Sequence, residues 1–256
     1  MTRVDYDSVA DGYDRRYVDV PFSGVEHTLT GFAAPSQRVL EVGCGTGHWL
    51  AWLSRMGCDV IGIDPSSEML QRASARPSAG VAIRARAEHL PLANGSVDRV
   101  LTINALHHFD DPEAFTREAQ RVLRPGGRVA VMGMDPSQGP DRWFVYDYFP
   151  RTLELDRARY PAMEQIGGWL SEAGLTAEDV GVVERLRVEK SAREYLESGD
   201  QMRNFTSQLL LLTDREFEDG IARIQADERA AAARGDELRL RAEVLMYAVY
   251  ATLDHP

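Results

Sequence analysis

The sequence predicts an α/β fold: a doubly wound, mostly parallel seven-stranded sheet with helices on both faces and a helical cap inserted before the last strand. Short β-branched runs alternate with helical stretches, which is typical of βαβ units in a parallel sheet. About fifty residues separate the last two expected strands, far more than a hairpin turn needs. The expected strands cover residues 38–42, 59–63, 81–85, 99–103, 128–132, 180–188 and a stretch within 242–253.

The segments between the strands carry helix and turn signals. Apolar residues recur at helical spacing from Trp49 to Leu53, and Pro112 after Asp111 is typical of a helix start. The Pro-Gly-Gly run within 123–127 predicts a turn before the fifth strand, and residues 162–173 predict a helix after it.

The long insertion near the C-terminal end predicts two or three helices. Capping-box patterns occur twice in it, at Ser191 with Glu194 and at Thr213 with Glu216. Before it, residues 143–149 hold five aromatic side chains. Aromatic residues most often serve as core, but this run follows the fifth strand, at the sheet edge where open α/β sheets bind ligands. Both interpretations stay open at this point.

Composition narrows the possible partners. The chain has 256 residues, 44% of them hydrophobic and 27% charged, which predicts a single packed domain. Its net charge of −11 disfavours a nucleic acid or an anionic membrane as partner. With no apolar run of about 20 residues and a charged N-terminal start, we expect a cytoplasmic protein, monomeric or homodimeric. Its two cysteines fit a reducing compartment, and we expect no metal site.

The first expected strand runs into glycines at 43, 45 and 47. Glycines at a strand-to-helix turn let a ligand approach the backbone closely, although a tight turn with no ligand is the alternative. A dinucleotide site would need a third glycine where His48 stands, and a phosphate-binding loop would need a Gly-Lys-Ser/Thr ending that the run lacks. Glu41 would repel a pyrophosphate but suits a cationic ligand.

Asp64 stands at the end of the second expected strand. Its distance from the first glycine is that of the acid that hydrogen-bonds a ribose hydroxyl pair. The alternative is a helix N-cap before residues 65–69, because Asp is common at that position. The combined spacing favours the ribose.

With the motifs at 86–91, 96–98 and 104–109, this ordered set resembles class I S-adenosylmethionine-dependent methyltransferases. The resemblance is to their small-molecule branch, the ubiquinone- and menaquinone-biosynthesis-like methyltransferases of type 11, and it runs from about Tyr6 to Met134. It implies a Rossmann-like fold in one domain over 1–256. Its expected parts are N-terminal lid helices over 1–30, a cofactor-binding core over 31–188, the helical cap insertion over 189–240 and the last strand over 241–256.

The resemblance implies S-adenosylmethionine as cofactor and S-adenosylhomocysteine as product. It assigns the methionine part to the glycine loop, the ribose to Asp64, the adenine to the residues around 65–69 and 87–88, and the amine to the Asn104 backbone. Arg86 departs from many relatives, which carry an acidic residue there. The implied cofactor-binding residues are Tyr13, Glu41, Gly43, Cys44, Gly45, Asp64, Pro65, Met69, Ala87, Glu88 and Asn104.

The same resemblance implies where an acceptor would bind. His107 is the candidate catalytic base, and we expect it to face the pocket while His108 anchors its loop. The tyrosines of the N-terminal lid resemble residues that face the acceptor, with core packing as the alternative. The implied substrate-binding residues are Tyr6, Tyr17, His107, His108, Trp143, Tyr146, Met202, Arg203 and Phe205.

These observations predict methyl transfer to a small-molecule acceptor, either a metabolite or a natural product. Three other functions stay open. A dehydrogenase would share the fold but needs the missing third glycine. A lyase or cyclase could keep S-adenosylmethionine without transferring its methyl group, and a non-enzymatic sensor would bind the cofactor without a substrate cavity.

Overall fold

The computed structural model describes residues 13–14, 17, 21–77, 80–139, 141–178, 180–197 and 206–255. Its strands form one sheet in the order β3-β2-β1-β4-β5-β9-β6, and β7 and β8 also pair with β9. The strands are β1 (Arg38–Val42), β2 (Asp59–Asp64), β3 (Val81–Arg84), β4 (Val97–Ile103), β5 (Leu123–Gly133), β6 (Arg142–Trp143), β7 (Thr176–Ala177), β8 (Gly181–Ser191) and β9 (Arg239–Thr252).

The expected α/β fold is confirmed, and each of the seven expected strands is present. β1 to β5 pair in parallel, whereas β9 is antiparallel to β5 and β8. The expected count of seven is nevertheless wrong, because the described sheet has nine strands. The two additional strands, β6 and β7, have two residues each and pair with β9. Two residues are too few to show a strand periodicity in the sequence.

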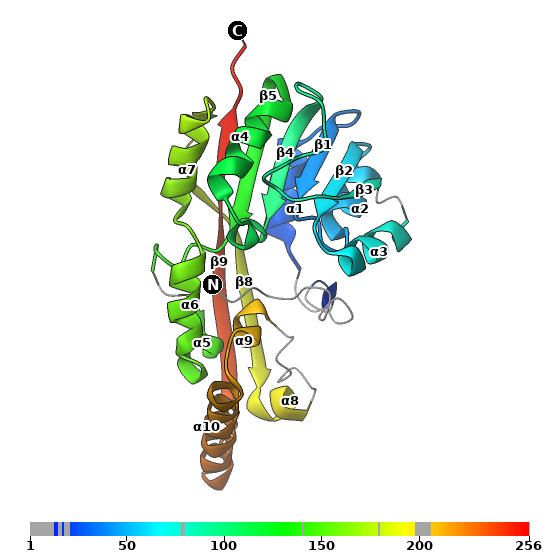
Figure 1. Cartoon of the computed structure of the whole chain (residues 1–256). Helices are drawn as coiled ribbons and strands as arrows, with labels where there is room; N and C mark the ends of the chain where they lie inside the picture. Colours follow the sequence, from blue (N-terminus) through cyan, green and yellow to red (C-terminus); the bar gives the residue numbers. More distant parts are fainter. Residues whose placement is uncertain are drawn as a thin grey trace.

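Helices cover both faces of the sheet (Figure 1). Alternate residues of β5 pack on opposite faces of the sheet. Val129 and Val131 belong to one hydrophobic cluster, and Ala130 and Met132 belong to the other. This alternation follows from the two-residue period of a strand. α4 (Pro112–Val122) and α7 (Met163–Glu172) pack in the first cluster, and α1 (Ser23–Phe32), α2 (His48–Arg55) and α3 (Ser67–Ala75) contribute to the second.

The expected helix starts are confirmed. Asp111 caps α4, with Pro112 in the first turn. Thr213 and Glu216 form a complete capping box, and Ser191 and Glu194 exchange the same two hydrogen bonds. α1 begins differently. The amides of Gly24 and Val25, in its first turn, donate to the carboxylate of Glu184, a residue of β8.

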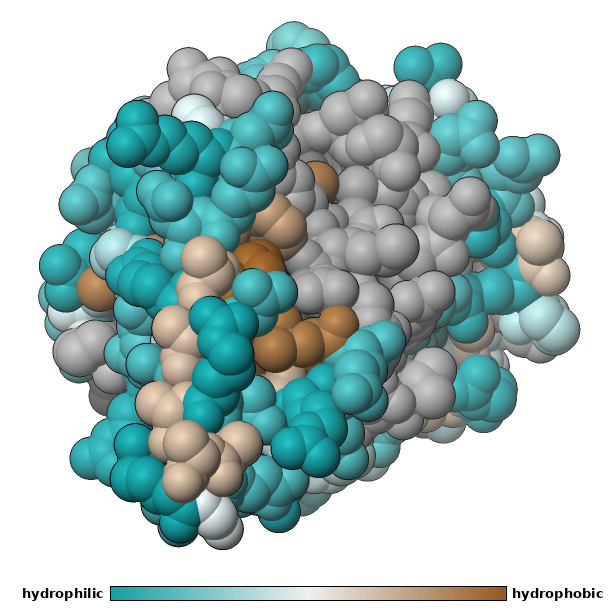
Figure 2. Space-filling view, turned by 90° about the horizontal axis from the view of Figure 1, so that it is seen from below, coloured by the Kyte–Doolittle hydropathy of each residue, from teal (hydrophilic) through white to brown (hydrophobic). Residues whose placement is uncertain are grey.

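β8 and β9 continue past the sheet as a two-stranded ribbon, and helices gather along it (Figure 1). We call this part the ribbon lobe. Its helices are α5 (Phe144–Tyr148), α6 (Arg151–Arg159), α8 (Ala192–Glu197), α9 (Ser207–Leu210) and α10 (Asp214–Ala233). Seen from below, its described surface is mainly hydrophilic, with hydrophobic atoms gathered near the centre (Figure 2).

The ribbon lobe has a hydrophobic cluster of its own. The aromatic run supplies Trp143, Phe144, Tyr146 and Phe149 to it, and helices α8 to α10 supply the facing residues, so the run is core. Phe149 lies so close to α10 that a Cβ added at Gly220 would stand 2.1 Å from its ring.

The last strand begins at Arg239, earlier than expected, because the helix before it ends at Ala233. Across the described residues, none of the helices has the length and apolarity needed to cross a membrane.

Candidate active site

The glycine loop between β1 and α2 forms one side of the candidate site. Gly43, Gly45 and Gly47 all have positive φ angles, of 78°, 51° and 75°. At Gly43 an added Cβ would stand 2.3 Å from the Cβ of Ala105, so both the backbone angle and the space require glycine there. The loop is held against β2, because the amides of Gly43 and Cys44 both donate to the Ile63 carbonyl, at 2.7 and 3.0 Å.

A buried carboxyl group lies beneath this loop. The Glu41 side chain is 1% exposed, and its Oε2 atom has no hydrogen-bond partner among the residues that the structure describes. Burial raises the pKa of Glu41 well above its ordinary value, the charge of Asp64 raises it further, and the amide of Leu50 partly offsets both. Burial likewise raises the pKa of the Cys44 thiol, which is therefore kept protonated. A cation bound nearby would favour the ionised form of Glu41.

Asp64 joins the glycine loop to the start of α3. One carboxylate oxygen accepts from the Gly45 amide and the other from the Ser66 amide, both at 2.9 Å. The N-cap of α3 is Ser66, whose hydroxyl accepts from the Met69 amide, so the alternative of Asp64 as N-cap is excluded. Carboxylate oxygens can each accept more than one hydrogen bond, so a carboxylate at this position suits a ligand that carries hydroxyl groups.

A cavity of about 1070 Å³ opens beside these loops, at the carboxyl edge of the parallel strands. Open α/β sheets bind ligands at this edge. It extends from the residues after β1 and β2 to α6 and α7. Of the predicted site residues it is lined by Gly43, Pro65, Ala87, Glu88, His107 and His108.

Glu88 and Arg86 form the wall of the cavity that follows β3. Glu88 Oε1 accepts from the amides of Asp110 and Asp111, at 2.7 and 3.2 Å, so this carboxylate fixes the loop before α4. Arg86 forms ion pairs with Asp110 and, at 3.5 Å, with Glu88. The arginine that departs from the family pattern is thus balanced by acids of the same wall.

His107 and His108 lie on a short 3-10 turn, η2 (Leu106–His108), after β4. Both line the cavity, with ring centroids 3.8 Å apart, which differs from the expectation that one would face the pocket and one would anchor the loop. Consecutive residues of a 3-10 turn are about 120° apart, so both can border one cavity. His107 also stacks on Tyr160 of the segment after α6, at 3.8 Å between centroids.

Asn104 precedes this turn with a φ of 51°, in the left-handed region that non-glycine residues seldom adopt. Its amide donates to the Met132 carbonyl at 2.8 Å, and its side-chain nitrogen lies 3.6 Å from the Met246 sulfur. Residues with such a strained backbone conformation occur preferentially at ligand sites.

The described residues of the N-terminal segment contact the glycine loop. The Thr46 hydroxyl donates to Asp14 at 2.5 Å, and Arg76 binds both Asp14 and, at 2.6 Å, the Thr46 carbonyl. The Tyr13 ring lies near Gly45 and packs on Met69, which is 1% exposed.

Other predicted substrate residues lie away from the cavity lining. Tyr17 stacks on His48 at 3.8 Å between centroids, while Trp143 and Tyr146 lie in the hydrophobic cluster of the ribbon lobe. Tyr6, Met202, Arg203 and Phe205 are outside the described residues.

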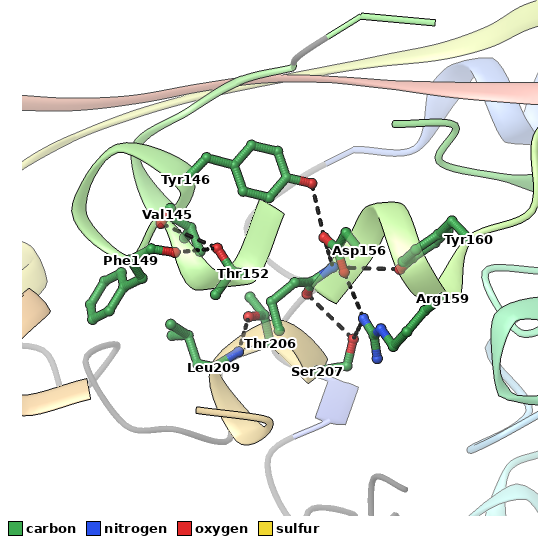
Figure 3. Close-up of polar contacts among 11 residues, drawn as sticks. Val145, Tyr146, Phe149, Thr152, Asp156, Arg159, Tyr160, Thr206, Ser207 and Leu209 are labelled. Carbon is green, nitrogen blue, oxygen red and sulfur yellow. Dashed lines mark hydrogen bonds and ion pairs between the residues drawn. The ribbon is translucent and has the colours of Figure 1, made fainter. Parts of the chain in front are cut away.

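A polar network at the end of α6 was not predicted from the sequence (Figure 3). Asp156, fully buried, accepts from the Tyr146 hydroxyl at 2.9 Å, from Arg159 Nη2 at 2.8 Å and from the Gln208 amide at 3.0 Å. The Gln208 amide also lies 3.4 Å from the Tyr160 hydroxyl. Burial raises the pKa of Asp156 although Arg159 opposes this. The Asp-x-x-Arg spacing could have indicated an ion pair within a helix, but not its place at a cavity.

Known proteins resemble the chain over the segment from β1 to β5. A model of the methyltransferase domain matches residues 40–131. An uncharacterized methyltransferase of Synechocystis is 30% identical over 148 residues, which cover 56% of the chain and 68% of that protein. Another, of Mycobacterium tuberculosis strain H37Rv, is 37% identical over 127 residues, which cover 50% and 51% of the two chains. The chain thus spans about half the length of the first curated relatives that it matches.

The fold also matches a solved structure over most of its length. A crystal structure described as a methyltransferase from an antibiotic biosynthesis pathway of Anabaena variabilis superposes with a TM-score of 0.70 and 24% identity. The match covers 91% of this chain and 98% of that one.

Proposed function

Because the chain belongs to the S-adenosylmethionine-dependent methyltransferases, we propose that it transfers a methyl group from S-adenosylmethionine to a small molecule bound in the cavity. The observation that carries this proposal is the cavity itself. One continuous space of about 1070 Å³ joins the glycine loop and Pro65 at one end to His107 and Tyr160 at the other. That volume is at the upper end of small-molecule sites, which span roughly 300–1,000 Å³.

The residues present fit the cofactor. Asp64 holds a carboxylate beside the glycine loop, where it suits ribose hydroxyls, Gly45 leaves room beside its backbone, and the buried carboxyl group of Glu41 suits a ligand with a cationic end. We assign the methionine part to Gly43, Cys44, Gly45 and the Asn104 backbone, and the adenine to Pro65, Met69, Ala87 and Glu88. When bound, the cofactor supplies an electrophilic methyl group on a sulfonium.

The protein's own contribution is alignment and proton removal. Methyl transfer is an in-line displacement, so holding donor and acceptor at the right distance supplies much of the rate enhancement. His107 borders the cavity and is held by stacking on Tyr160, so it can accept a proton from an acceptor hydroxyl or amine in a fixed position. Imidazole is the side chain that titrates nearest neutral pH.

We assign the insertion the role of a cap that supports the acceptor end of the cavity. None of its described residues lines the cavity, which at this end is walled by the α6 segment 157–161. The insertion reaches that segment through Gln208 and Ser207, which contact Asp156 and Arg159. Through these contacts, the described part of the insertion supports the cavity by way of α6.

The decisive experiment incubates the protein with methyl-labelled S-adenosylmethionine and a metabolite extract. We expect label in one low-molecular-weight product, together with S-adenosylhomocysteine. Label only in peptides or nucleic acids would contradict the small-molecule acceptor. Turnover with the methyl group retained on the cofactor would establish a lyase or cyclase instead, and cofactor binding without any product would favour a sensor.

A further inference from the structure

We propose that the acceptor carries a carboxylate or phosphate group and that Arg159 binds it. This inference rests on the proposed function and names the class of its substrate. Arg159 lies at the end of α6 and lines the cavity, and its side chain is only 10% exposed. Its Nε and Nη1 atoms are buried and have no hydrogen-bond partner among the residues that the structure describes.

The unsatisfied atoms are a strong indication of a ligand. Nε and Nη1 together carry three of the five N–H donors of a guanidinium. Buried polar groups in native proteins almost always have partners, and a buried donor without one destabilises the fold. An anionic oxygen in the cavity would satisfy them with charge-assisted hydrogen bonds, which are roughly twice as strong as neutral ones.

The rest of the guanidinium is already held in place. Nη2 donates to Asp156 at 2.8 Å and lies 3.4 Å from the Ser207 hydroxyl, while the guanidinium carbon lies 5.4 Å from the centroid of the Tyr160 ring (Figure 3). A side chain fixed in this way loses little further freedom on binding a ligand. Asp156 thus positions Arg159 and balances its charge, but it binds Nη2 and leaves Nε and Nη1 without a partner among the described residues.

The charged residues that line the cavity differ between its walls. On the wall after β3, Arg86 forms ion pairs with Glu88 and Asp110, so the charges there are largely balanced. The α6 segment contributes Arg157 and Arg159 to the lining and no acid. Its lining therefore has a net positive charge, which favours an anion there.

Part of the cavity lining is apolar. Leu106, Phe109, Pro161 and Trp169 line the cavity between the histidine turn and α7. They favour an aromatic or other apolar body in the acceptor. We therefore infer an acceptor with an apolar body, a nucleophilic atom near His107 and a carboxylate or phosphate near Arg159.

Calorimetric titration of the S-adenosylhomocysteine complex tests this assignment. The probes are benzoate, phenyl phosphate and the uncharged benzamide. We expect one of the two anions to bind about tenfold or more tightly than benzamide, because it forms charge-assisted hydrogen bonds. Tighter binding of benzoate would indicate a carboxylate on the acceptor, and tighter binding of phenyl phosphate would indicate a phosphate. Equal affinity for benzamide and both anions, or no binding of either anion at millimolar concentration, would overturn the inference.

Variants of α6 identify the residue. Arg159→Gln removes the charge, Arg159→Lys keeps it without the planar group, and Arg151→Gln is the matched control, since Arg151 is an exposed arginine of the same helix that pairs with Glu154. We expect Arg159→Gln to abolish the preference for the anion, Arg159→Lys to reduce it and Arg151→Gln to retain it. An undiminished preference in both Arg159 variants would contradict the role of Arg159.

Affinity for S-adenosylhomocysteine separates this inference from the proposed function. Each variant is first titrated with that compound alone, and wild-type affinity shows that it is folded. If Arg159→Gln fails this control, Arg159→Lys decides the question. Failure of the wild-type protein to bind S-adenosylhomocysteine would contradict the proposed function, whereas binding it without discriminating benzoate or phenyl phosphate from benzamide contradicts only the anion site.

Discussion

Asp64 holds two loops of the candidate site together. Its two oxygens tie Gly45 to Ser66, at opposite sides of the site, so it shapes the loops that would surround a ribose. The sequence predicted its place at the end of a strand but not these two backbone partners. Backbone geometry in a glycine loop depends on how neighbouring strands are aligned, which spacing alone does not specify.

We predict that Asp64→Ala weakens S-adenosylhomocysteine binding by about 10- to 100-fold, because hydrogen bonds to a charged group contribute roughly 1.5–3 kcal/mol. Thermal shift measurements check this, since a ligand at about 100 times its dissociation constant stabilises the wild type by roughly 2.7 kcal/mol. Asp59→Ala is the control, because Asp59 lies at the other end of β2 and pairs with Arg38. Equal shifts in both variants would contradict the ribose assignment.

His107 is the proposed general base, and stacking on Tyr160 holds its ring in place. We predict that His107→Ala lowers kcat by about 10²- to 10⁴-fold, the usual contribution of a general base, with S-adenosylhomocysteine affinity nearly unchanged. Steady-state kinetics on the acceptor found by labelling and calorimetry on the same samples measure the two effects. If His107→Ala keeps full activity across the pH range, the acceptor needs no base.

His48 makes stability depend on pH. Burial, followed by the charge of Arg76, lowers its pKa from 6.5 to about 4 in the folded protein. Between these values the unfolded chain binds a proton that the folded protein does not, so the free energy of unfolding rises with pH. The stabilisation from neutral His48 is complete above pH 6.5 and is lost as the pH falls to about 4.

We predict that His48→Gln reduces the slope of unfolding free energy against pH in this window, measured by urea denaturation at several pH values. The comparison must be between variants, because the raised pKa values of buried acids such as Glu41 contribute slopes of the opposite sign. His27→Gln, at an exposed position of α1, should leave the wild-type slope. A slope that His48→Gln does not change would rule out this residue as its source.

At the scale of elements, the sequence predicted what has a local signal. The capping boxes, the Asp-Pro helix start and the seven expected strands are present, although β5 and β9 begin earlier than expected. α6 was missed because its residues, 151–159, are mostly polar and charged and show no clear apolar stripe. Its importance comes from tertiary contacts, in which Asp156 is buried between α5 and α9.

Packing of α10 on the aromatic run depends on one glycine. We predict that Gly220→Ala destabilises the protein by about 1–3 kcal/mol, the usual cost of overpacking, because the new methyl group would meet the Phe149 ring. Gly168→Ala in α7 is the control, since nothing lies within 4 Å of its added Cβ and alanine favours a helix. Urea denaturation measures both. A Gly220→Ala protein as stable as the wild type would show that α10 can shift away from Phe149.

At the scale of the whole molecule, our proposals place the cofactor on the sheet part and one end of the acceptor on α6 of the ribbon lobe. We predict that S-adenosylhomocysteine slows hydrogen exchange at residues 43–47, 64–66 and 104–108 and leaves α10 unchanged, because the proposed cofactor residues of these segments belong to the sheet part. An acceptor should in addition protect residues 156–160. Exchange measured by mass spectrometry checks this. Equal protection of α10 by S-adenosylhomocysteine alone would contradict the division.

β9 belongs to both parts without a linker. Residues 247–252 pair with β5 in the sheet, while residues 242–243 pair with β6 and β8 in the lobe. A chimaera that exchanges lobes between relatives must therefore be spliced inside a continuous strand. A splice that shifts the strand by a single residue would turn every following side chain to the opposite face. New acceptor specificities are therefore more accessible through substitutions on α6 than through transplantation of the whole lobe.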